Sequence, residues 1–195
     1  VLLGDLLRLA AERHPRKPAL VFGETVETFA ALEAAANRLA HAVTGLGLGR
    51  GDTVAILARN RPEHVVALFG IARTGCLLAA LSPLSAPEEI ARILALSEAR
   101  LLLFDPEFAP VVDLVAPRCP GLAHRIQLGG PYDAFVAAMP ADPPDRAIAE
   151  DDPVAMTFTG GTTGHAASIG SNQRLLHRHS QGDCTMRARQ GLSNT

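Results

Sequence analysis

Short apolar runs alternate with helical stripes through the first half of the chain, and this alternation restricts the fold more than any other feature. The runs 54–57, 76–81 and 100–104 are typical of buried strands, because each is short, apolar and bounded by turn residues. Between them, apolar residues recur at helical spacing over 65–72 and 90–97. Such an order is typical of right-handed βαβ crossovers. It predicts an α/β fold with a mainly parallel sheet and flanking helices.

The segments on either side extend this pattern. Two short runs joined through Gly23 and Glu24 predict an N-terminal hairpin, and Thr28 is placed to cap the helix that follows. Capping-box patterns predict that Asn60 and Ser85 begin the two crossover helices. The remaining expected elements are helices near 3–10, 108–116 and 132–139, strands at 124–128 and 154–159, and a Pro- and acid-rich connector over 140–153.

Composition places the chain among globular proteins and excludes several classes of function. It is 48% hydrophobic and 19% charged with a net charge of −2, which fits neither disorder nor a surface for nucleic acid. The longest apolar run, 65–72, is far shorter than the roughly 20 residues of a membrane span. Cys76, Cys119 and Cys184 are few and widely spaced, which is typical of reduced thiols. These features predict a cytoplasmic protein, with Cys76 in its core.

The strand at 154–159 runs directly into the strongest candidate for a functional site. The six residues are Thr159, Gly160, Gly161, Thr162, Thr163 and Gly164. Glycines let backbone amides approach phosphate oxygens closely, and threonine hydroxyls add further donors. A plain turn is the alternative, but six such residues at a strand end favour a phosphate-binding loop.

Other motifs give weaker evidence for a function. The loop is not a Walker A motif, because the required lysine is absent. The glycine run 45–51 lacks the third glycine of a dinucleotide fingerprint and follows a helix, so it predicts a turn. Asp151 and Asp152 predict a surface turn. No metal site is expected, because the histidines and cysteine of the tail lack a second ligand pair; these are His177, His179 and Cys184.

The segment "TFTGGTTGHA", residues 157–166, resembles the phosphate-binding signature T-S-G-T-T-G-x-P-K-G of the adenylate-forming (AMP-binding) acyl-CoA synthetases. Residues 17–57 and 59–105 resemble the hairpin, helix and βαβ units that begin that family's fold. The resemblance implies that residues 1–164 are an incomplete N-terminal domain of an AMP-binding synthetase. Residues 165–195 are polar and differ in character, and they predict a poorly ordered tail.

The resemblance implies a two-step ligase. A carboxylic acid, fatty or aryl, attacks the α-phosphate of Mg-ATP, and coenzyme A then takes the acyl group; ATP, Mg²⁺ and coenzyme A are the implied cofactors. The six loop residues would hold the β- and γ-phosphates. The sequence departs from the signature, because Gly160 replaces a serine and Ala166, Ala167 and Ser168 replace Pro, Lys and Gly.

Two functions from different classes remain open at this point. The first is a truncated ligase that does not turn over alone, because the family's adenine, acyl and lid elements lie further along. The second is a non-catalytic folded remnant or interaction module with at most weak nucleotide binding, prone to self-association through uncovered apolar surface. The change after Gly164 suggests an interrupted gene for a longer synthetase, and a divergent short protein is the alternative. An unrelated P-loop hydrolase is disfavoured by the missing lysine.

Overall fold

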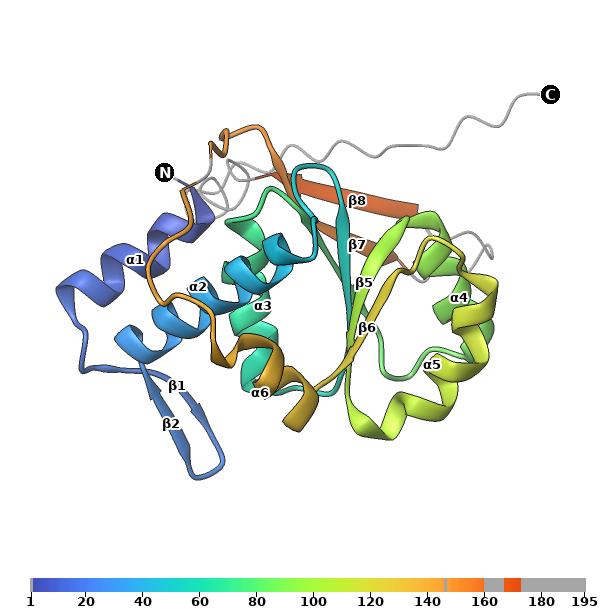
Figure 1. Ribbon diagram of the computed structural model, residues 1–195, viewed down its shortest axis with the longest axis horizontal. Coiled ribbons are helices and arrows are strands. Elements are labelled where there is room, and N and C mark those ends of the chain that lie inside the picture. The colour runs from blue at the N-terminus through green and yellow to red at the C-terminus, as the bar shows by residue number, and fades with distance from the viewer. Residues whose placement is uncertain (1, 146, 160–166, 173–195) are drawn as a thin grey trace.

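A six-stranded sheet forms the centre of the computed structural model, which describes residues 2–145, 147–159 and 167–172 (Figure 1). The strand order is β6-β5-β3-β4-β7-β8, and every neighbouring pair is parallel except the antiparallel pair β7–β8. The strands are β3 (Thr53–Leu57), β4 (Leu77–Leu81), β5 (Ala99–Phe104), β6 (His124–Gln127), β7 (Pro153–Thr159) and β8 (Ala167–Asn172). The mainly parallel sheet predicted from the apolar pattern is confirmed.

Helices cover both faces of this sheet (Figure 1). α2, α3 and α6 lie on one face, with α1 packed against α2 and α3, whereas α4 and α5 lie on the other. The helices are α1 (Leu3–Arg13), α2 (Phe29–Gly45), α3 (Pro62–Ala72), α4 (Pro87–Leu96), α5 (Ala109–Val115) and α6 (Gly130–Ala137). Short 3-10 turns at Pro106–Phe108 and Ala116–Arg118 flank α5. The predicted hairpin is present as β1 (Pro18–Phe22) and β2 (Thr25–Thr28).

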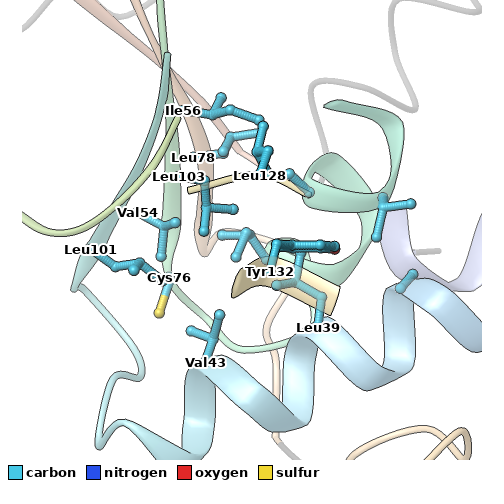
Figure 2. Close-up of a cluster of buried hydrophobic side chains, with 14 of the residues drawn as sticks. Leu39, Val43, Val54, Ile56, Cys76, Leu78, Leu101, Leu103, Leu128 and Tyr132 are labelled. Atoms are coloured by element: carbon cyan, nitrogen blue, oxygen red, sulfur yellow. The ribbon is translucent and has the colours of Figure 1, made fainter. Parts of the chain in front are cut away.

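The central strands are apolar at successive positions because helices cover both faces of the sheet. In β3, Val54 and Ile56 enter the core beneath α2 and α3, whereas Ala55 and Leu57 enter the core beneath α4 and α5. All four side chains are fully buried. A strand that faces protein on both sides has no solvent face to make polar, so its sequence loses the usual alternation. Figure 2 shows the first of these cores, where side chains of the sheet meet α2.

Helix starts differ in part from the sequence prediction. Thr28 caps α2 as expected, because its hydroxyl accepts a hydrogen bond from the Ala31 amide at 3.2 Å. The capping boxes predicted at Asn60 and Ser85 are wrong, since α3 and α4 begin at Pro62 and Pro87 and have no side-chain cap. Proline at the first helical position is preorganised and has no amide to satisfy, so it determines where these helices begin.

β8 is an element that the sequence did not indicate. The apolar pattern predicts no regular element after Gly164, whereas residues Ala167–Asn172 pair along the whole of β7. The pairing is made by backbone groups at the edge of the sheet, and the sequence "ASIGSN" carries no alternation that would reveal it. The rest of the predicted tail, residues 165–166 and 173–195, lies outside the described residues. Within the described part of the chain, no helix has the length and apolar character that crossing a membrane requires.

Glu98 has a backbone conformation that a glycine would adopt more readily. It follows the C-cap residue Ser97 of α4, and its φ of 51° is the only positive φ of a non-glycine residue in the described chain. Exchanging Glu98 for glycine should raise the free energy of unfolding by up to about 1 kcal/mol, because the left-handed region is open to glycine without a Cβ penalty. Urea unfolding measures the change. Glu98→Ala, which keeps the Cβ, is the matched control, and an equal gain there would contradict the explanation.

Candidate phosphate-binding loop

β7 leads the candidate loop to the carboxyl edge of the parallel sheet. It runs parallel to β4, with Ala155 beside Leu78 and Met156 beside Ala79. Ligands of open α/β sheets bind outside the carboxyl ends of the strands, so the direction of β7 suits a binding loop at its end. Thr159 is the last residue of β7. The other five predicted residues, 160–164, lie outside the described residues.

The β7–β8 hairpin defines where the chain leaves the sheet and where it returns. Thr159 pairs with Ala167, so residues 160–166 connect two positions that are neighbours in the ladder. The Cα atoms of directly paired antiparallel residues are about 5 Å apart. Ala167, where the resemblance would place the signature's lysine, therefore lies at the base of the loop, opposite Thr159.

Side chains hold β7 from both faces of the sheet. Val154 is fully buried and packs with Leu3 and Ala72 near α1 and α3. Met156 and Phe158 pack against the core on the opposite face, beneath α4 and α5. A shift in the β7–β8 register between Pro153 and Ala155 accompanies this change of face. The strand that ends at the candidate loop is thus anchored before the loop begins.

The amino end of β7 is fixed by a buried carboxylate. Asp152 is only 3% exposed, accepts a hydrogen bond from the Ala149 amide at 2.9 Å and forms an ion pair with Arg50. The predicted turn is present, because the Asp152 amide donates to the Ala149 carbonyl at 3.0 Å, and Asp151 is exposed as expected, but the predicted surface position is wrong for Asp152. The turn predicted for the glycine run 45–51 is confirmed, because the Asp52 amide donates to the Gly49 carbonyl at 3.0 Å. The glycine run thus has a structural role beside β7.

Internal ion pairs occupy the carboxyl ends of β3 and β5. Asp105 follows β5, accepts a hydrogen bond from the Arg59 amide at 2.8 Å and pairs with the Arg61 guanidinium. Arg61 also donates to Glu63 at 2.6 and 2.7 Å, and Arg59 contacts Glu107 at 2.7 Å. The hydrogen bonds that Arg61 donates to Glu63 and then to Asp105 outweigh desolvation and raise the pKa of Arg61. The sequence analysis did not predict this cluster. Because its charged groups pair with one another, the glycine–threonine loop is still the candidate site.

Thiols and possible metal ligands do not form a second centre in the described chain. Cys76 and Cys119 are buried, as expected for Cys76, and they form no disulfide with each other. Burial raises the pKa of the Cys119 thiol, which lowers its reactivity. Among residues 2–145, 147–159 and 167–172, no three His, Cys, Asp or Glu side chains gather in a way that could hold a metal ion. The tail residues considered above as metal ligands lie outside these ranges.

Comparison with known proteins identifies the family. The model of the AMP-binding enzyme family matches residues 7–170, so the match includes the whole parallel sheet and most of β8. The chain belongs to the AMP-binding enzyme family.

Relatives within this family activate different acids. The chain is 35% identical over 156 residues to the fatty acid–[acyl-carrier-protein] ligase ScoC of Streptomyces coeruleorubidus, covering 79% of the chain and 30% of ScoC. It is 31% identical over 169 residues to the 3-hydroxybenzoate–CoA ligase of Aromatoleum sp. (strain CIB), covering 84% and 31%. The solved N-terminal domain of FACL13 from Mycobacterium tuberculosis superimposes with a TM-score of 0.86 at 28% identity, covering 90% and 45%. The chain spans about a third of the length of these curated relatives.

Proposed function

We propose that the chain supplies the triphosphate-binding part of an ATP-dependent ligase that activates a carboxylic acid. A carboxylate oxygen attacks the α-phosphorus of Mg-ATP, the bond to pyrophosphate breaks, and a thiol, that of coenzyme A, later displaces AMP from the acyl-adenylate. The observation that carries the proposal is the glycine–threonine signature, which begins at the carboxyl end of β7 inside the family match.

The role assigned to the loop is electrostatic. Amides and hydroxyls of Thr159, Gly160, Gly161, Thr162, Thr163 and Gly164 would bind the β- and γ-phosphates and stabilise the charge that gathers on the leaving pyrophosphate. Preorganised donors of this kind need no reorientation during the reaction, and they supply several kcal/mol at a well-formed site. β7, whose side chains pack on both faces of the sheet and which pairs with β8, provides the rigid support that such donors need.

The substrate class follows from the relatives. Their names specify a fatty acid in one case and 3-hydroxybenzoate in another, so we propose a fatty or aryl acid for this protein. We propose coenzyme A as the acceptor, as in the name of the 3-hydroxybenzoate ligase, whereas ScoC is named for an acyl-carrier protein. We further propose a cytoplasmic location, in keeping with the few, widely spaced cysteines. These 195 residues by themselves are not expected to complete the reaction, because they span only a third of the relatives.

A non-catalytic module is the second candidate. Alanine at position 167 favours it, because a ligase loop without its lysine lacks a positive charge beside a highly charged anion. Large apolar side chains also lie exposed on the β1–β2 hairpin and on α4 and α5, and we propose that they promote self-association. They are Val21, Phe22, Val26, Leu96 and Leu114.

A lysine placed at the base of the loop distinguishes the two candidates. Ala167→Lys should tighten binding of Mg-ATP roughly three- to tenfold, since it adds one charge-assisted contact to the triphosphate. Asn172→Lys is the matched control, because it adds the same charge at the opposite end of β8, beside Pro153. Equilibrium dialysis with labelled ATP measures both. Equal gains in the two variants, or no gain in either, would support the non-catalytic module.

A further inference from the structure

A pocket of about 260 Å³ opens between α2, α3 and α6. Leu32, Val66 and Val136 contribute an apolar wall, one from each helix. A cavity of roughly 150 Å³ is enough to hold a benzene molecule, so this pocket has room for a six-membered ring with a short substituent. The size and the apolar wall of the pocket therefore suit a small ligand with a compact apolar body.

Tyr132 contributes to this pocket a hydroxyl for which the described residues supply no hydrogen-bond partner. Tyr132 belongs to the core beneath α2, where Figure 2 shows it near Leu39. It also lines the pocket and is only 6% exposed. Tyrosine hydroxyls usually hydrogen-bond to protein or to water. A polar group of a bound ligand would supply such a partner.

The charges around the pocket are mainly negative. Glu27, Asp133 and Glu63 line it together with a single cation, Arg38. Glu63 is already paired with Arg61, whereas the carboxylates of Glu27 and Asp133 have no partner among the described residues. Burial, and then the charges of Glu63 and Asp133, raise the pKa of Tyr132 above its usual value. The phenol therefore stays neutral near pH 7, and its oxygen can accept a hydrogen bond.

We propose that this pocket binds a small organic cation, consisting of an ammonium group on a compact apolar body. The ammonium donates to the Tyr132 hydroxyl and lies near the carboxylates of Glu27 and Asp133, while the body contacts Leu32 and Val66. The proposal does not depend on the ligase function, because none of its residues belongs to the candidate loop.

Tyr132 itself provides the signal for the test. It is the only tyrosine of the chain, which contains no tryptophan, so tyrosine fluorescence reports on this position alone. Cyclohexylmethylammonium, which does not absorb where tyrosine does, is the probe, and cyclohexanecarboxylate and cyclohexylmethanol are the anionic and neutral controls. We expect a saturable change with the ammonium and binding at least about threefold weaker for both controls. No saturable change, or tighter binding of the carboxylate, would overturn the proposal.

Substitutions in the pocket test whether the ammonium binds there. Asp133→Asn should weaken binding of the ammonium about two- to fivefold, whereas Glu88→Gln on α4, across the sheet, should leave it unchanged. Tyr132→Phe removes only the hydroxyl, and the ligand-induced rise in thermal midpoint should then require about tenfold more ligand. Binding that is insensitive to both pocket variants would show that the ammonium occupies another place, and the proposal would fail.

Discussion

Replacing Arg73 with methionine should lower the free energy of unfolding by about 3–5 kcal/mol, the range expected when one partner of a buried ion pair is removed. Arg73 follows α3 and is 8% exposed. Its guanidinium donates to both carboxylate oxygens of Glu33, at 2.6 and 2.9 Å, to the Gly4 carbonyl at 2.8 Å, and to Asn37. Methionine fills much of the volume but leaves the Glu33 carboxylate without its cation, and the Gly4 carbonyl and the Asn37 side-chain oxygen without this donor.

The same exchange at the surface provides the control for Arg73. Arg8 contacts Glu12 at 2.6 Å, but both side chains are well exposed, so Arg8→Met should cost no more than about 1 kcal/mol. Arg73→Lys should fall between the two, because lysine keeps the charge but cannot make the bidentate contact. Urea unfolding followed by circular dichroism measures all three variants. A loss at Arg73 as small as that at Arg8 would show that the buried network does not tie α1, α2 and α3 together.

Gly70→Ala should destabilise the protein by about 1–3 kcal/mol although alanine favours helices. Gly70 lies in α3 where it crosses α2, and a Cβ atom there would lie 2.8 Å from the Ala36 carbonyl oxygen and 3.3 Å from the Leu39 side chain. The nearer obstacle is backbone, which cannot rotate away, so the two helices must separate. This separation loosens the core beneath them.

Gly45→Ala is the control for Gly70→Ala, and we expect it to change the stability in the opposite direction. Gly45 is the last residue of α2, and a Cβ atom there would meet nothing within 4 Å. Gly45→Ala should therefore be neutral or stabilise by up to about 1 kcal/mol. Thermal and urea unfolding of the two variants give the comparison. If both alanines stabilise, the helices can move apart at no cost, and the explanation based on close packing is wrong.

The central sheet was predictable from sequence because burial on both faces leaves a strong local signal. β3, β4 and β5 are short apolar runs, and the intervening helices carry clear stripes. The helix starts were less predictable, since a proline at the first helical position competes with a nearby capping residue. β8 was missed because backbone pairing holds an edge strand whatever its side-chain pattern.

The candidate site, like the fold, was predictable from sequence only in part. The glycine–threonine loop was predictable because its residue types and its position after a strand are local properties. The Arg61–Asp105 pair joins residues 44 positions apart, and the pocket at Tyr132 requires three helices and part of β2. Such arrangements arise from tertiary packing, and a single sequence holds no local trace of them. The buried ion pair of Asp152 with Arg50 belongs to the same class.

Binding of Mg-ATP by the loop tests the central claim most directly. The measurement is equilibrium dialysis of labelled ATP against the chain and against the double variant Thr162→Ala/Thr163→Ala, with Thr25→Ala in the β1–β2 hairpin as control. We expect weak, saturable binding that the double variant reduces about tenfold and the control leaves unchanged. Binding that is absent, or equal in all three proteins, would contradict the assignment of residues 159–164 as a triphosphate-binding loop.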